Sequence, residues 1–172
     1  MNANGKIERR FFGPTVLCSE RFPMARRLHN EEARQNLSAQ MATQGAEIHN
    51  RYGPEIGWSA LKRLLEDRSC VRYPCEIRFD SAPLLPGEFA HPVPRGNVPE
   101  DGYIIYVHPV YETQLERVSY LVLHQLVWVN YGASAEADDA EAFGAVVLGL
   151  SREDYFSALC ELAGQLGGDE LV

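Results

Sequence analysis

The segment His124–Trp128 has the spacing of a metal-binding pair on a helix, and it lies inside a long apolar stretch, Val118–Val129. Two imidazoles one helical turn apart can hold a zinc ion, and a glutamate between them can act as a general base, as in the pattern His-Glu-x-x-His. Here His124 fills the first histidine position, whereas Gln125 and Trp128 stand at the glutamate and second histidine positions. This spacing points to metal-assisted hydrolysis, with two of the three working groups replaced.

Both replacements remove the chemistry that the pattern requires. The indole of Trp128 offers an N–H donor and no free lone pair for a metal. The amide of Gln125 has the shape of a glutamate but cannot accept and pass on a proton near neutral pH, and general-base catalysis is commonly worth about 10²- to 10⁴-fold in rate. We therefore predict that Gln125 and Trp128 are degenerate positions, and that Trp128 fills the volume that a metal would take.

The elements around His124 are predicted as one buried helix between a small sheet and two further helices. The apolar pattern runs from Glu112 to about Tyr131 and stops near Gly132, which is typical of a helix C-terminus. Ser134 is the expected N-cap of the next helix. The inner face of that helix is predicted to contain Ala140, Phe143, Val147 and Leu150. A last helix begins at Ser151, with Tyr155, Leu159, Leu162 and Leu166 as its apolar stripe.

Upstream of this helix, alternating and uniformly apolar runs predict strands. Tyr73 to Phe79 alternates, a segment rich in Pro and Gly allows a short edge strand near Glu88–His91, and Tyr103–Val107 has the composition of a strand covered on both faces. Two helices are expected before the sheet, over about Asn30–Asn50 and Pro54–Asp67. The order is two helices, a small sheet and three helices, which is the α+β class.

Residues 73–150 resemble the minimal core of zincin-like metallopeptidases of the gluzincin type. The resemblance rests on the two strands, on the Pro86-Gly87-Glu88-Phe89 turn, on the helix with His124, and on the acidic helix after Gly132. It implies that an acidic residue of the following helix is the third metal ligand. Glu136 and Glu141 could each be this ligand. Glu136 is slightly favoured, because it lies on the apolar stripe through Ala140 and Phe143, whereas Glu141 lies one position off it. Because the helix motif is degenerate, the resemblance implies a catalytically inactive zincin-like protein with a binding or structural role, and no cofactor.

Two other interpretations stay open at this point. In the first, His91 or His108 joins His124 and Glu136 or Glu141 in a rearranged ligand set, and the chain is a zinc-dependent hydrolase. In the second, the chain is a small α+β protein unrelated to zincins, and His124 is a core residue hydrogen-bonded to a carbonyl or carboxylate. The acidic run 136–141 also has a simple explanation, because carboxylates suit the positive end of a helix dipole.

Composition limits the kinds of partner. The chain has 172 residues and a formal net charge of −8, and 45% of its residues are hydrophobic, which suits a single domain with one core. The acidic balance argues against nucleic acid as a partner, because phosphate binding needs clustered Lys and Arg. No apolar run reaches the roughly 20 residues of a membrane span, and no signal-peptide core is present, so we expect no membrane partner and a cytoplasmic location.

Cysteines and the remaining histidines add little chemistry. Four reduced cysteines are expected, and the close pair Cys70 and Cys75 has neither CxxC spacing nor a second pair to complete a zinc site. We expect Cys160 to be a core residue, and no cysteine carries the signature of a catalytic nucleophile. His29 and His49 lie on the polar N-terminal helix, where we expect solvent exposure.

The chain divides into an irregular arm (1–28), a helical extension (29–68), the zincin-like core (73–150) and a final helix with its tail (151–172). The arm and extension are the natural place for a protein partner or a homo-oligomer surface. The candidate contact residues there, which could equally pack in the core, are Phe11, Phe12, Tyr52 and Trp58.

Overall fold

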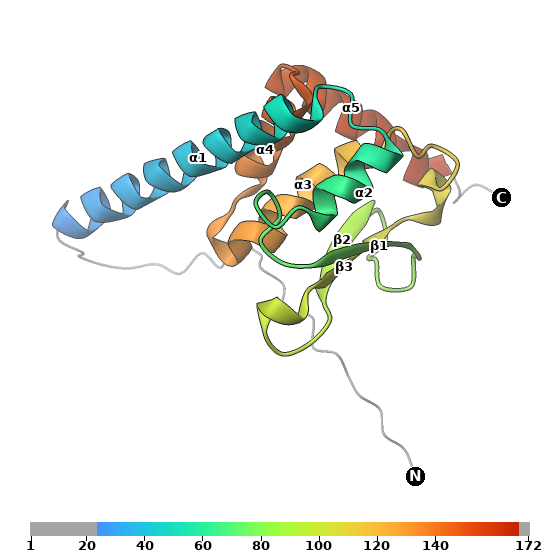
Figure 1. Ribbon diagram of the computed structural model, residues 1–172, viewed down its shortest axis with the longest axis horizontal. Coiled ribbons are helices and arrows are strands. Elements are labelled where there is room, and N and C mark those ends of the chain that lie inside the picture. Colours follow the sequence, from blue (N-terminus) through green and yellow to red (C-terminus); the bar gives the residue numbers. More distant parts are fainter. Residues whose placement is uncertain (1–23, 169–172) are drawn as a thin grey trace, which may run out of the picture.

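The fold is α+β, as a computed structural model that describes residues 24–168 shows (Figure 1). The sheet has strands β1 (Cys75–Phe79), β2 (Ala90–Pro94) and β3 (Tyr103–Val107). The helices are α1 (Met24–Tyr52), α2 (Trp58–Glu66), α3 (Val118–Tyr131), α4 (Ala137–Leu148) and α5 (Arg152–Gly164). The predicted class and the strand Tyr103–Val107 are therefore confirmed.

Strand β3 lies in the centre of the sheet, with β1 parallel on one side and β2 antiparallel on the other. One face of β3 is fully covered, because Ile105 and Val107 are completely buried, whereas Ile104 and Tyr106 on the other face are half-buried. Helix α3 packs on the covered face, α4 and α5 pack against α3, and α1 packs on α4 (Figure 1). The expectation of a strand buried on both faces is therefore only half right.

The outer edge of the sheet at β2 is closed by proline. Two backbone bonds, from His108 N to Phe89 O and from Arg95 N to Gly102 O, orient the odd-numbered residues of β2 toward β3. Because strand residues alternate in direction, the main-chain groups of Pro92 and Pro94 point outward, where proline offers no N–H donor. This arrangement protects an edge strand against pairing with another chain.

Several boundaries differ from the sequence prediction. Helix α3 begins at Val118 rather than Glu112. Residues 109–117 form 3₁₀-type turns instead, in which a backbone N–H donates to the carbonyl three residues earlier, as from Glu112 N to Pro109 O. The extended backbone of Gly57 delays α2 to Trp58. The edge strand begins at Ala90, two residues later than the predicted start at Glu88, and helix α1 already begins at Met24, inside the predicted irregular arm. Phe11 and Phe12 lie outside the described residues.

The N-cap of α4 is Glu136 and not Ser134. Ser134 belongs to a short 3₁₀ turn, Gly132–Ser134, and Gly132 ends α3 with a φ of 58°, as its position predicted. The carboxylate of Asp139 accepts from the backbone N–H of Glu136 at 2.8 Å. Arg34 of α1 pairs with Asp139 at 2.8 Å and with Glu136 at 3.1 Å, so this helix start also ties α4 to α1.

Helices α3, α4 and α5 meet at a point where only glycine fits. Tyr155 is fully buried, stacks on Tyr120 at 5.9 Å and donates to the Tyr120 carbonyl at 2.7 Å. A Cβ atom on Gly144 would lie 2.1 Å from Cζ of Tyr155. The predicted inner faces of α4 and α5 are confirmed for Ala140, Phe143, Val147, Tyr155, Leu159 and Leu162, all of which are buried.

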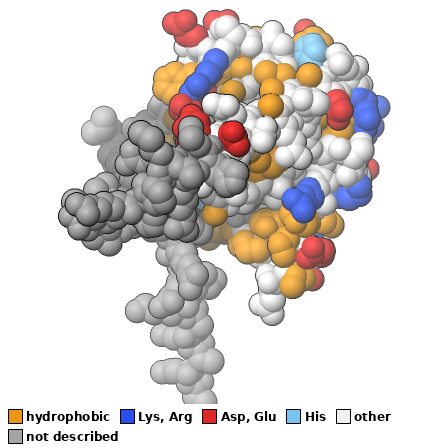
Figure 2. Space-filling view, turned by 90° about the vertical axis from the view of Figure 1, so that its left-hand side faces the viewer, with side chains coloured by type: hydrophobic (Ala, Val, Ile, Leu, Met, Phe, Trp, Pro, Cys, Tyr) orange, Lys and Arg blue, Asp and Glu red, His pale blue; other side chains and the backbone are white. Residues whose placement is uncertain are grey.

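The described surface carries mixed charge. Figure 2 shows acidic and basic side chains interspersed on the face seen from the left end of Figure 1. The large hydrophobic side chains exposed in the described part, Leu85, Val98, Val146 and Phe156, are widely spaced along the sequence. Over residues 24–168, none of the helices is long and apolar enough to span a bilayer.

Candidate functional site

One stripe of α3 is partly open, and it carries the degenerate motif. Val118–Val129 is otherwise buried, but Tyr120, His124 and Trp128 are only half-buried. Residues four apart lie on the same face of a helix, so His124 and Trp128 lie one turn apart on this stripe. The spacing of the motif is therefore reproduced in space, with an indole where the pattern has its second imidazole.

His124 lies in an apolar setting. Its ring meets the ring of Phe89 edge-on at 5.8 Å, and its Nδ1 atom is buried without a hydrogen-bond partner among the described residues. Burial lowers the pKa of His124 below its ordinary value, and the nearby Glu141 carboxylate opposes this shift only in part. The imidazole is therefore expected to be neutral at pH 7.

Of the two acidic candidates, the structure brings Glu141 rather than Glu136 toward His124. Glu136 is the α4 N-cap, its side chain is 67% exposed, and it pairs with Arg34. Glu141 lies one turn further along α4 and accepts from Arg152 at 3.0 and 3.1 Å. The slight preference for Glu136 was wrong, because residues before the first turn of α4 face α1 and not α3.

The other two histidines lie apart from His124. His91 pairs across the sheet with Tyr106, on the face opposite the buried Ala90 and Val107, and its Nδ1 lies 3.0 Å from Glu88. His108 accepts from the backbone N–H of Val110 at 3.3 Å and caps a short 3₁₀ turn. Strand alternation directs His91 away from α3, so the structure does not bring His91 together with His124.

The donor groups near His124 do not fit a catalytic zinc. Such a site has three protein ligands, and within residues 30–167 no three side chains of His, Cys, Asp or Glu lie close enough together to hold an ion. Glu141 is the carboxylate whose charge acts on His124, and that charge is already matched by Arg152. Gln125 is 7% exposed and carries no ionisable group.

Three cysteines fall in the described part, and none has the setting of a nucleophile. Burial raises the pKa of Cys75 to about 11 and also raises the pKa of Cys70. Cys160 is exposed on α5, so the prediction of a core position was wrong. Its place on the polar side of the helix follows from the stripe through Leu159 and Leu162, which directs position 160 outward.

His49 was also misplaced by the sequence analysis. Its Nδ1 lies 3.0 Å from the Val147 carbonyl, and its ring packs against Gly149, which adopts a φ of 66°. A side chain at position 149 would collide with this ring. The polar composition of α1 hid this contact, because among residues 30–52 the only large side chains of α1 that are buried are Met41 and Ile48.

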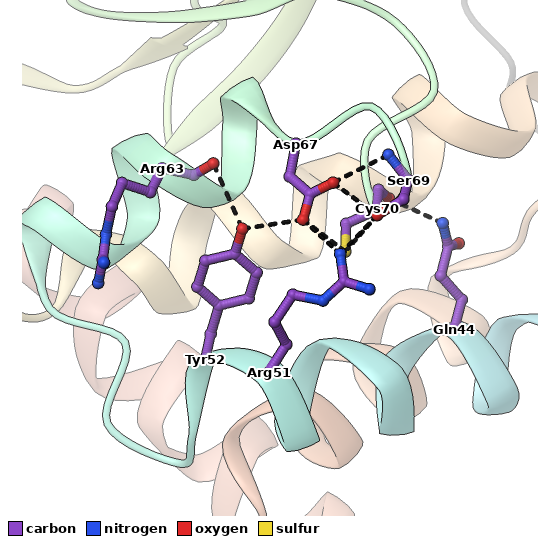
Figure 3. A network of polar contacts seen from close by, with 7 residues as sticks. All are labelled: Gln44, Arg51, Tyr52, Arg63, Asp67, Ser69 and Cys70. Carbon is purple, nitrogen blue, oxygen red and sulfur yellow. Dashed lines mark hydrogen bonds and ion pairs between the residues drawn. The ribbon is translucent and has the colours of Figure 1, made fainter.

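A polar network around Asp67, which the sequence analysis did not single out, joins α1 and α2 (Figure 3). Asp67 accepts from Arg51 at 2.6 Å, from Tyr52 at 3.0 Å, and from the hydroxyl of Ser69 at 2.5 Å. These bonds hold the pKa of Asp67 well below its ordinary range, with the Ser69 bond as the largest cause. Tyr52 and Trp58, two of the candidate contact residues, therefore make contacts within the chain: Tyr52 bonds to Asp67, and the ring of Trp58 packs on that of Phe79 at 5.9 Å.

The neutral state of His124 predicts a specific acid dependence of stability. Since the pKa of His124 is lowered by folding, the unfolded chain takes up the proton first as pH falls below about 6.5. The free energy of unfolding should be highest above that pH and should fall below it. In His124→Gln this fall should be smaller between pH 7.5 and 5, measured by urea denaturation. If the free energy of unfolding fell by the same amount in His124→Gln, His124 would not be the group that causes the acid dependence.

Comparisons of the chain with protein-family models, with curated proteins and with solved structures find no match.

Proposed function

We propose that this chain is a non-catalytic protein built on a zincin-like core, which acts by binding or as a structural component. The observation that carries the proposal is the stripe of α3, where His124 and Trp128 lie one turn apart and Glu141 of α4 approaches His124. The layout supports the scaffold, and the substitutions at Gln125 and Trp128 argue against hydrolysis. The ion pair of Glu141 with Arg152 gives that carboxylate a structural partner.

The proposal is tested by the metal content of the protein. The chain is purified without chelator and without an affinity tag, and bound zinc is measured in the native protein and in His124→Ala. We expect less than stoichiometric zinc in both. Stoichiometric zinc in the native protein that is lost in His124→Ala would overturn the proposal and favour the metal-dependent hydrolase instead.

Trp128 should contribute to stability as a packing residue. Its side chain is half-buried and packs against the core, so Trp128→Ala removes apolar contact area and leaves a gap beside His124. We expect a loss of about 2 kcal/mol, below the value for a fully buried tryptophan. For a chain of this length the melting temperature should fall by roughly 4–8 °C. An unchanged melting temperature would show that the indole does not fill the site.

A further inference from the structure

An open hollow of about 620 Å³ lies between α1, the loop after α2 and the C-terminal end of α3. This volume is in the range of pockets that hold small molecules. Its lining is polar and includes Gln44 and Glu47 of α1, Arg68 and Arg72 of the loop, and Asn130 and Tyr131 of α3. The hollow is distinct from the His124 stripe, because it is built around the last residues of α3.

The two arginines of this hollow carry charge that no carboxylate neutralises. Six arginines among residues 30–167 form ion pairs with Asp or Glu at up to 3.1 Å: Arg34, Arg51, Arg78, Arg95, Arg117 and Arg152. Among residues 30–167 the remaining arginines, Arg63, Arg68 and Arg72, have no such partner. Two of these three line the same hollow, in a chain whose net charge is −8.

Both guanidinium groups are held in position by contacts that leave donors free. Arg68 donates to the carbonyls of Leu65 and Val71 at 2.6 and 3.3 Å. The guanidinium of Arg72 lies over the ring of Tyr73, at 5.4 Å from its centre, and pairs with no carboxylate among the described residues. Stacking on an aromatic ring orders an arginine without using its N–H groups.

The loop that carries the two arginines is fixed at several points. On one side the Asp67 network ties it to Arg51 and Tyr52, and Gln44 donates to the Cys70 carbonyl at 2.7 Å (Figure 3). On the other side the buried Asn130 accepts from the backbone N–H of Arg72 at 2.9 Å and donates to the Cys70 carbonyl at 3.2 Å. Such a frame reduces the conformational entropy that a ligand would have to remove.

We propose that this hollow binds the phosphate group of a small phosphorylated molecule. Guanidinium groups bind phosphate oxygens through paired, charge-assisted hydrogen bonds, and two unpaired arginines match a dianionic group. The lining has a single carboxylate, Glu47, which can accept from a hydroxyl or amino group elsewhere on the same molecule.

Titration with inorganic pyrophosphate, followed by amide NMR shifts, tests the proposal. We expect saturable shifts at Arg68–Arg72 and Asn130. In Arg72→Gln the affinity should fall about tenfold, the effect of losing a charged hydrogen bond. Arg63→Gln is the matched control, because Arg63 also lacks a carboxylate partner but lies outside the hollow, and its affinity should be unchanged. Arg68 is not substituted in this test, because its hydrogen bonds to two backbone carbonyls support the loop.

The other outcomes decide against the proposal. No saturable shift at millimolar pyrophosphate would overturn it, and so would an equal loss of affinity in Arg63→Gln, which would indicate non-specific charge attraction. Tighter binding of succinate than of pyrophosphate would overturn the choice of phosphate. Arg72→Gln should keep the native melting temperature, because the Arg72 side chain is exposed.

Discussion

Gly144→Ala is expected to destabilise the protein by about 3 kcal/mol, the upper end of the cost of overpacking a core. The added methyl group would lie 2.1 Å from Cζ and 2.2 Å from the hydroxyl oxygen of Tyr155. Tyr155 cannot move aside easily, because it is fully buried and its hydroxyl is bonded to the Tyr120 carbonyl. The measurement is urea denaturation at pH 7, monitored by circular dichroism.

Gly164→Ala is the matched control for this substitution. Gly164 is the last residue of α5, and a Cβ atom there would meet nothing within 4 Å. Alanine favours helix over glycine by up to about 1 kcal/mol, so the control should be neutral or slightly stabilising. In the Tyr155→Leu background, Gly144→Ala should cost less free energy of unfolding than it does in the native chain, because the ring that causes the collision is absent. A neutral Gly144→Ala would mean that α4 and α5 are not packed as described.

A triple variant, Gln125→Glu, Trp128→His and Arg152→Ala, is expected to gain zinc binding with a dissociation constant of about 1 μM or tighter. The imidazole introduced at position 128 would lie one turn from His124, and the loss of Arg152 would free Glu141. These three groups make the ligand number of a catalytic zinc site. The measurement is competition against a zinc-binding dye.

Three controls make the result specific to the geometry. Adding Glu141→Gln should weaken the gained zinc affinity, and adding His124→Ala should abolish it. Arg152→Ala alone should gain nothing, because Trp128 offers the metal no lone pair. If the triple variant keeps its native circular dichroism spectrum and still binds no zinc, the core does not have the zincin-like geometry, and the proposed function loses its basis.

Local patterns were sufficient to predict much of this fold. The uniform apolar run Tyr103–Val107 is a strand, Gly132 ends α3 with a positive φ, and Ser151 caps α5 by accepting from the backbone N–H of Asp154 at 3.0 Å. Each of these depends on a few neighbouring residues whose conformational preferences agree. The same is true of the i, i+4 spacing that places His124 and Trp128 together.

Errors arose where a distant contact decides the outcome. Glu136 and Glu141 are both plausible by spacing, and only the packing of α4 against α1 shows that Glu136 faces Arg34. His49 is in a polar stretch, yet the positive φ of Gly149 brings the α4 terminus onto its ring. The hollow with Arg68 and Arg72 has no motif, since it is assembled from two helices and a loop that are distant in sequence. The single usable signal was Asp67-Arg68-Ser69, because Asp followed by Ser favours an Asx turn.

The two outward-facing prolines of β2 also bear on how the chain reaches its folded state. Strands β2 and β3 are only eight residues apart in sequence, so this ribbon can form early, before the chain of α3, α4 and α5 is available to cover it. At that stage an ordinary edge would invite pairing with another newly made copy, which is a common route to aggregation. Pro92 and Pro94 deny the second copy its N–H donors, so the exposed ribbon is safer during synthesis than its apolar sequence alone suggests.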